Sequence, residues 1–295
     1  MKNNQTETIA YRGRFAPSPT GLLHFGSLVT AVSSYLEAKV HDGEWLVRIE
    51  DLDASREVPG ASSKILYMLE NLGMVWDGEV IYQSQRKRYY QDALNSIRRL
   101  GLVYSCTCSR KEIAASCIIG EIGPIYPGTC RGNLASKKHT ALRVRTDNKP
   151  INFEDVLRGS IAQRLESDTG DFVLRRADGT FAYQLAVVVD DAEQNITHVV
   201  RGTDLLESTP RQIYLQQLLG YAIPSYMHLP IVTNSSGEKL SKQTRADPID
   251  LSKAPSLLVA ALRYLGQAPP DELANCNNSS IWQWAIENWK RDKIL

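Results

Sequence analysis

The sequence predicts an α/β fold with an open sheet of parallel strands, and three features of the chain carry this prediction. Residues 14–28 form a strand, a Pro/Gly-rich turn and a helix start in succession. Residues 45–49 are an apolar run of strand length that acidic side chains follow at once. Two further runs, at 186–189 and 197–200, also end in charged residues. Short apolar runs of this kind are typical of strands buried on both faces of a parallel sheet.

The first turn predicts a phosphate site. Pro17, Pro19 and Gly21 restrict the turn, and the helix after it has unpaired N–H groups at its N-terminus, where anions are favoured. His24 and Gly26 lie just before that helix, where an imidazole can donate to a phosphate and a residue without Cβ lets a nucleotide approach. A plain helix entry with a satisfied histidine explains the same residues. The helix itself is indicated by apolar residues at helical spacing, Leu28, Ala31, Val32, Tyr35 and Leu36.

The strand at 45–49 ends at Glu50 and Asp51. Ligands of open α/β sheets lie at the carboxyl ends of the strands, so these two carboxylates are placed where a substrate would bind. For Asp53 we favour a structural role as the cap of the next turn. Two amphipathic helices follow, the second opened by Ser84. Their core stripes are Ile65, Met68, Leu69 and Leu72, then Tyr90, Ala93, Leu94, Ile97 and Leu100.

Residues 103–131 break this pattern, because they hold four of the five cysteines and sustain no helical period. We interpret them as part of an insertion. Cys106, Cys108 and Cys130 are spaced as ligands of a small structural zinc site, which needs a fourth ligand to complete a tetrahedron. Tyr126 and Cys117 are the candidates, and ligand chemistry favours the thiolate. Free buried cysteines without a metal are the alternative.

Alternation of apolar and polar residues predicts strands at 141–146, 151–155 and 171–175, followed by a hairpin turn at 177–180. We therefore interpret residues 104–172 as a connective subdomain.

The chain then returns to the first sheet with the predicted strands at 186–189 and 197–200. Tyr183 and Arg201 flank the ligand-bearing edge of that sheet, although Arg201 could instead be the ion-pair partner of Asp204. Thr209 and Pro210 supply a cap and a proline for the start of the next helix.

Composition limits the classes of function. Among 295 residues, Lys and Arg number 34 and Asp and Glu number 33, so RNA binding would depend on a local face rather than on a global basic field. The start of the chain is polar, and no stretch approaches the roughly 18 apolar residues of a membrane span. An odd number of cysteines with a Cys-x-Cys pair fits reduced thiols. We expect a cytoplasmic monomer that does not bind membranes.

A second motif lies late in the chain. Lys239-Leu-Ser-Lys242 stands in a polar loop opened by residues 234–237. With the Pro-x-Pro-Thr-Gly-x-x-His-x-Gly turn, it resembles the HIGH and KMSKS signatures of class I aminoacyl-tRNA synthetases. Three further segments resemble the glutamyl branch of that family. They are Arg14-Phe-Ala-Pro-Ser, Arg48-Ile-Glu-Asp-Leu-Asp and Tyr183-Gln-Leu-Ala-Val-Val-Val-Asp-Asp.

The resemblance implies a Rossmann-like catalytic domain that forms glutamyl-adenylate from glutamate and ATP, with Mg²⁺ accompanying ATP. It implies that His24, Gly26 and Lys242 bind ATP and act in catalysis together with Lys239. The glutamate-binding residues that it implies are Arg14, Phe15, Ala16, Pro17, Ser18, Glu50, Tyr183 and Arg201. It also favours Tyr126 as the fourth zinc ligand, and it makes the connective subdomain one of the type that binds an acceptor stem.

The chain is short for a glutamyl-tRNA synthetase. We expect one catalytic half at 1–103, the zinc-containing insertion at 104–172, the second catalytic half at 173–245 and a helical tail at 246–295 in place of an anticodon-binding domain. Trp282, Trp284 and Trp289 of this tail are interpreted as core residues.

The acceptor is implied by the short relatives within the glutamyl branch, which the chain resembles over about residues 11–270. Residues 56–60 and 201–212 are especially similar to them. These relatives transfer glutamate to the queuosine base of tRNA(Asp). A truncated glutamyl-tRNA synthetase that charges the terminal adenosine is one alternative, and an RNA-binding regulator without catalysis is another. Retention of His24, Gly26, Lys239 and Lys242 weighs against the regulator.

Overall fold

The computed structural model describes residues 10–120, 123–132, 140–232 and 249–294. In its first part, three short strands form a parallel sheet in the order β1-β2-β3, with β1 at Arg12–Phe15, β2 at Glu44–Ile49 and β3 at Ile81–Tyr82. Helix α1, Phe25–Lys39, follows the first turn and packs against β1 and β2. The predicted strand, turn, helix and second strand are therefore confirmed. One detail was wrong, because Gly26 lies inside the first turn of α1 rather than before it.

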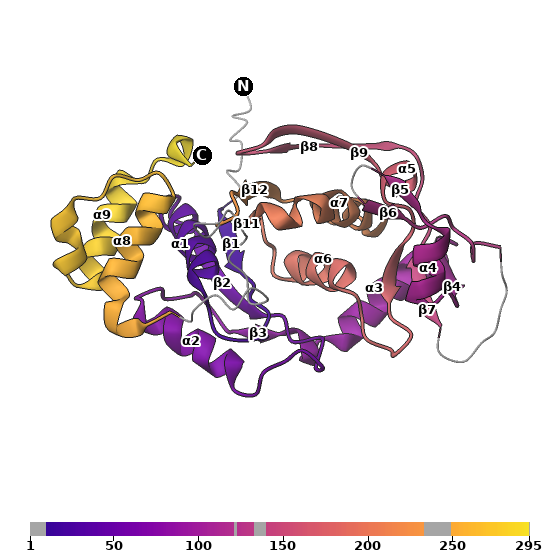
Figure 1. Ribbon diagram of the computed structural model, residues 1–295, viewed down its shortest axis with the longest axis horizontal. Coiled ribbons are helices and arrows are strands. Elements are labelled where there is room, and N and C mark those ends of the chain that lie inside the picture. Colours follow the sequence, from indigo (N-terminus) through magenta and orange to yellow (C-terminus); the bar gives the residue numbers. More distant parts are fainter. Residues whose placement is uncertain (1–9, 121–122, 133–139, 233–248, 295) are drawn as a thin grey trace, which may run out of the picture.

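A second sheet continues the first. Its order is β11-β12-β8-β9, with β11 at His198–Gly202, β12 at Ser225–Leu229, β8 at Pro150–Asp155 and β9 at Gly159–Arg164. Strand β11 lies beside β1, where the N–H of Thr197 donates to the carbonyl of Arg12 at 2.9 Å (Figure 1). The carboxyl ends of β1, β2 and β11 thus meet at one edge of the sheet.

The predicted strand at 186–189 was wrong, because these residues belong to helix α6, Tyr183–Glu193. Every residue from Leu185 to Asp191 is buried, since α6 packs against α3, α7 and β10. A helix covered on all sides reads as one continuous apolar run, which its sequence cannot distinguish from a buried strand. Tyr183 therefore lies at the start of a helix, and Asp190 and Asp191 lie within one.

The insertion has a sheet of its own. Antiparallel strands pair in the order β10-β7-β4, with β4 at Val103–Cys106, β7 at Ala141–Val144 and β10 at Phe172–Arg175. The strands predicted at 141–146, 151–155 and 171–175 are confirmed with shifted ends. A short helix, α4 at Arg110–Ser116, was not expected. It is held by a capping box in which Ser109 and Glu112 bond each other's backbone.

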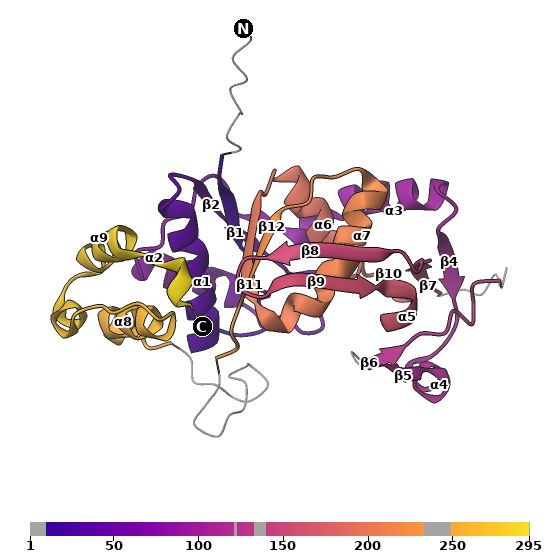
Figure 2. The same ribbon diagram turned by 90° about the horizontal axis from the view of Figure 1, so that it is seen from above.

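Figure 2 shows the hairpin of β8 and β9 extending between the insertion and the centre of the molecule. There β8 joins β12 in parallel, with Asp155 opposite Tyr226. The insertion is therefore connected by hydrogen bonds to the sheet that contains β11 and β12. Its remaining elements are β5 at Ile118–Gly120, β6 at Gly123–Ile125 and α5 at Leu165–Asp168.

The remaining helices cover the sheets and form the C-terminal part. Helix α3 begins at Lys87, because a 3-10 turn occupies Gln83–Gln85 where the sequence predicted its start. In the C-terminal part, α8 packs against α1 and α9, beside α1 in Figure 1. Trp282 of α9 is buried and its indole N–H donates to the carbonyl of Leu72 at 2.8 Å, which supports its predicted core role. The bounds are α2 Ala61–Asn71, α3 Lys87–Arg99, α7 Thr209–Leu219, α8 Ala254–Tyr264 and α9 Asn278–Asn288.

Within the described ranges, every helix is too short or too polar to cross a lipid bilayer.

Candidate active site

A cavity of about 960 Å³ opens at the shared carboxyl edge of the strands. It is lined by the turn after β1, the start of α1, the end of β2, the start of α6 and the end of β11. The described residues that were predicted to bind ATP or glutamate all line it. They are Arg14, Phe15, Ala16, Pro17, Ser18, His24, Gly26, Glu50, Tyr183 and Arg201. Lys239 and Lys242 lie outside the described residues.

His24 is the N-cap of α1. Its ring Nδ1 accepts the backbone N–H of Ser27 at 3.3 Å, and its Nε2 lies 3.1 Å from the Ser27 hydroxyl. The helix entry considered from the sequence is therefore present. The same histidine also lines the cavity with Gly26, so a phosphate bound there would meet the N-terminal turn of a 15-residue helix.

A buried ion-pair network lies beneath the cavity. Asp191 accepts from Nε and Nη2 of Arg14 at 3.1 and 3.4 Å and from Nη2 of Arg48 at 2.7 Å. The second terminal nitrogen of Arg48 donates to Gln194 at 2.6 Å. Burial opposes ionisation of Asp191, but the two arginines lower the pKa of this carboxyl below its ordinary value.

Asp191 was not singled out as a site residue, because the interpretation of its segment as a strand did not show that its carboxylate faces Arg14 and Arg48. The signal was present in the chain, since Arg14 and Arg48 both fall in apolar strands and two buried guanidinium groups require an acidic partner.

Glu50 is the polar group best suited to a cation. Its Oε1 lies 3.7 Å from Nη2 of Arg48, and among the described residues this buried oxygen has no hydrogen-bond partner. Burial raises the pKa of Glu50 to about 7, although Arg48 and Arg14 act in the opposite direction. A substrate ammonium would supply the missing partner.

The neighbouring carboxylates have structural roles. Asp51 accepts from the backbone N–H and the hydroxyl of Ser84 at 2.8 and 2.6 Å. Asp53 accepts from Ser55, and from Arg56 and Arg176 at 3.0 Å each, at the mouth of the cavity. The turn-capping role expected for Asp53 is thus supported.

Arg201 enters the cavity from the end of β11. Its Nη1 lies 3.5 Å from the Tyr183 hydroxyl, and its Nη2 donates to the Thr209 hydroxyl at 2.7 Å. The side chain is nearly enclosed, with 4% of the residue exposed. Its guanidinium therefore has a fixed orientation toward Tyr183.

Three thiols gather in the insertion. The sulfur atoms of Cys106, Cys108 and Cys130 all lie within 4.8 Å of one another. The Tyr126 hydroxyl is 3.3 Å from Cys106 and 3.8 Å from Cys108. Cys117 instead donates to the carbonyl of Ala114 at 3.4 Å and lies outside the group. Three thiols and one phenol fit a tetrahedral metal site, and the geometry favours Tyr126 over Cys117 as the fourth ligand.

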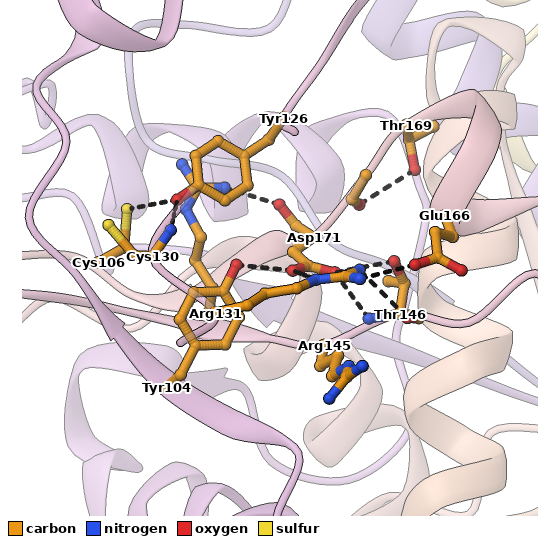
Figure 3. Close-up of polar contacts among 12 residues, drawn as sticks. Tyr104, Cys106, Tyr126, Cys130, Arg131, Arg145, Thr146, Glu166, Thr169 and Asp171 are labelled. Atoms are coloured by element: carbon orange, nitrogen blue, oxygen red, sulfur yellow. Dashed lines mark hydrogen bonds and ion pairs between the residues drawn. The ribbon is translucent and has the colours of Figure 1, made fainter. Parts of the chain in front are cut away.

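The loop that carries Tyr126 and Cys130 is anchored to the sheet of the insertion by Asp171 (Figure 3). Arg131, next to Cys130, donates from Nε and Nη2 to the two oxygens of Asp171 at 2.6 Å each. Asp171 also accepts from the Tyr104 hydroxyl at 2.6 Å. Arg131 also donates to Glu166 at 2.6 Å, and Cys106 is itself the last residue of β4. A change at the thiols can therefore reach the antiparallel sheet both directly and through these carboxylates.

The parallel sheet, the helix that follows the first turn and the cavity at the strand ends are the arrangement of a nucleotide-binding α/β domain. The family described as "tRNA synthetases class I (E and Q), catalytic domain" matches residues 10–285. The chain belongs to this family, and the resemblance found in its sequence is confirmed.

Proteins named Glutamyl-Q tRNA(Asp) synthetase are similar to the chain over nearly its whole length. The one from Dechloromonas aromatica is 57% identical over 287 residues, which cover 96% of this chain and 95% of that protein. The one from Chromobacterium violaceum is 53% identical over 286 residues, with the same two coverages of 96% and 95%.

Solved structures agree on the fold. A glutamate tRNA ligase from Elizabethkingia meningosepticum, in complex with its amino acid, has a TM-score of 0.78 and 26% sequence identity. The comparison covers 97% of this chain but 66% of that ligase, so the chain spans about two thirds of its length. Methionyl-tRNA synthetase from Mycobacterium tuberculosis has a TM-score of 0.58 at 13% identity over 90% of this chain and 67% of the other, which shows the fold alone.

Proposed function

We propose that the cavity activates glutamate with ATP and that the protein then transfers the glutamyl group to the queuosine base of tRNA(Asp). The observation that carries this proposal is 50–57% identity, over nearly the full chain, to proteins named for that reaction. The buried carboxylate and arginines of the cavity supply the chemistry that a glutamate pocket requires.

In the first step, an oxygen of the α-carboxylate attacks the α-phosphorus of ATP. The bond from that phosphorus to the bridging oxygen breaks, and pyrophosphate leaves with the electron pair. Such a transfer depends on positioning and on neutralising charge. The N-terminus of α1, with His24 and Gly26, would stabilise the phosphates. Lys239 and Lys242 keep the phosphate-binding role that the sequence predicts, and Mg²⁺ would neutralise further charge on the phosphates when it arrives with ATP.

Glutamate is recognised by three charged side chains. The ionised form of Glu50 would accept from the ammonium group, and Arg14 and Arg201 would each bind a carboxylate. Because Asp191 engages Nε and Nη2 of Arg14, the substrate contact of Arg14 would fall to Nη1. Phe15, Ala16, Pro17 and Ser18 shape the wall next to Arg14, and Tyr183 closes the pocket beside Arg201.

In the second step, a hydroxyl of the queuosine base attacks the carbonyl carbon of the mixed anhydride, and AMP leaves. The insertion would hold the RNA. A zinc ion bound by Cys106, Cys108, Tyr126 and Cys130 would stabilise its fold and take no part in the reaction. The reduced thiols of that site fit a cytoplasmic protein.

Retention of Glu50 weighs against a regulator that has lost catalysis. A buried carboxylate oxygen without a hydrogen-bond partner destabilises a fold, so a binding module would gain stability from replacing it. An ordinary glutamyl-tRNA synthetase would share the first step and differ in the acceptor.

Glutamate-dependent ATP–pyrophosphate exchange in the absence of RNA tests the first step. We expect glutamate to support exchange without RNA, because the residues proposed to bind glutamate lie in the catalytic domain. Aspartate and glutamine should support none. Exchange that appears only after tRNA is added would mean that the RNA assembles the pocket. Absence of exchange under both conditions would contradict the proposed function.

A further inference from the structure

A chain of buried hydrogen bonds connects the insertion to the proposed glutamate pocket. Nε of Arg201 lies 3.0 Å from Nε2 of His228, and Nδ1 of His228 lies 2.5 Å from an oxygen of Asp155. His228 is fully buried on β12, and 3% of Asp155 is exposed at the end of β8. Neither residue is among those that the sequence singled out.

The chemistry of the two outer groups fixes the state of the imidazole between them. Arg201 can only donate, so Nε2 of His228 must present its lone pair. Asp155 also accepts the backbone N–H groups of Leu157 and Arg158 at 3.1 and 3.0 Å, which favours its ionised form. An ionised carboxylate can only accept, so Nδ1 of His228 must carry the proton. The ring is therefore neutral, with its proton on Nδ1.

The surroundings of His228 are consistent with the neutral ring. Burial lowers the pKa of His228 and Arg201 lowers it further, while the hydrogen bond to Asp155 acts in the opposite direction. The Thr209 hydroxyl lies 3.1 Å from Nε2 and accepts from Arg201, so it can donate to the same lone pair. Arg158, whose Nε donates to the His228 carbonyl at 3.2 Å, and the Tyr226 ring, stacked at 6.1 Å between centroids, also lie beside it. A proton on Nε2 would set a donor against the Arg201 donor.

The pair formed by Asp155 and His228 also helps to determine which edge of the Arg201 guanidinium faces the substrate. Nε of Arg201 donates to Nε2 of His228, and Nη2 of Arg201 donates to the Thr209 hydroxyl. Nη1, the nitrogen beside the Tyr183 hydroxyl, is the one that these two contacts leave for the cavity. If the Nε contact were lost, the guanidinium could rotate about its last side-chain bonds and the pairing with Tyr183 would no longer be fixed.

We propose that Asp155 and His228 are positioning residues, which hold Arg201 and through it Tyr183 in the orientation that binds glutamate. This inference rests on the proposed function. It assigns a role to the inserted hairpin beyond RNA contact, because the carboxylate that sets the His228 tautomer comes from β8 of the insertion.

Two substitutions at one position test the inference. In His228→Gln, the amide oxygen can lie near the position of Nε2 and still accept from Nε of Arg201. In His228→Asn, the amide reaches only the position of Nδ1, so Nε of Arg201 loses its acceptor while Nη2 keeps the Thr209 hydroxyl. In pyrophosphate exchange, we expect His228→Asn to raise the KM for glutamate about tenfold or more, with kcat and the KM for ATP little changed. His228→Gln should stay within about threefold of wild type. Equal effects of both variants on the KM for glutamate, or equal losses in kcat and KM, would overturn the positioning role.

Nitrogen NMR of protein labelled with ¹⁵N-histidine reads the tautomer directly and requires no activity. We expect one histidine, identified by its absence in His228→Gln, to be protonated at Nδ1 and unprotonated at Nε2 at pH 7. A proton on Nε2 would overturn the inference, whatever the kinetics. If wild-type protein shows no exchange with glutamate but has the expected tautomer, the proposed function fails while the Asp155–His228–Arg201 geometry holds.

Discussion

Glu50 predicts a pH dependence of glutamate binding that can be worked out from the structure. Its pKa is raised from an ordinary 4.5 to about 7. Because the folded-state pKa is raised, the carboxylate that binds the ammonium group is present above pH 7 and is lost as the pH falls through 7. With that pKa, about nine tenths of Glu50 is ionised at pH 8 and about one tenth at pH 6.

The KM for glutamate should therefore rise about tenfold between pH 8 and pH 6, because the charges of glutamate itself do not change in this range. Pyrophosphate exchange at a series of glutamate concentrations measures it. Glu50→Gln is the control, since an amide cannot ionise. It should show a raised and nearly constant KM from pH 6 to 8, by about tenfold to a hundredfold relative to wild type at pH 8.

Two results would refute the reasoning. One is a wild-type KM for glutamate that does not change between pH 6 and 8. The other is an unchanged pH dependence in Glu50→Gln, which would mean that another group titrates.

Three further predictions concern the network beneath the cavity, the thiols and the C-terminal part. Asp191→Asn should raise the KM for glutamate and lower the free energy of unfolding by about 3 kcal/mol, because two buried arginines lose their shared charge. The control Asp53→Asn, at the mouth of the cavity, should change the free energy of unfolding by about 1 kcal/mol or less. Equal effects of the two variants on stability would contradict the role of Asp191 as the shared partner of Arg14 and Arg48. Metal analysis should find about one zinc per chain, and this zinc should be lost in Cys108→Ser but kept in Cys117→Ser. Cys108→Ser should impair the transfer of glutamate to RNA more than it impairs pyrophosphate exchange. Trp282→Ala should lower the free energy of unfolding in urea by about 3 to 5 kcal/mol; a change below about 1 kcal/mol would mean that α9 does not complete the core.

The sequence predicted the parts of the site whose residues are close together in the chain. The turn after β1, the start of α1 and the carboxylate at the end of β2 each follow from a local pattern, so Arg14, His24 and Glu50 could be placed in one cavity. Helix α4 was missed, although the capping pair Ser109 and Glu112 is visible in the sequence.

Contacts between distant segments could not be predicted in this way. The run at 186–189 was interpreted as a strand because a helix buried on all sides has no polar face to reveal its period. That error removed Asp191 from the turn of α6 that faces Arg14 and Arg48. Asp155 and His228 are 73 residues apart, and their pairing depends on β8 joining β12. Local spacing contains no information about that register.

The acceptor is the central claim, and transfer of labelled glutamate to a short RNA tests it most directly. The RNA is an anticodon stem–loop of tRNA(Asp) with queuosine at the wobble position, which has no terminal adenosine to charge. We predict stable labelling of this stem–loop in the presence of ATP and none of the same stem–loop with guanosine in place of queuosine. Equal labelling of the stem–loops with queuosine and with guanosine, or labelling only of the terminal adenosine of intact glutamate tRNA, would contradict the proposed function.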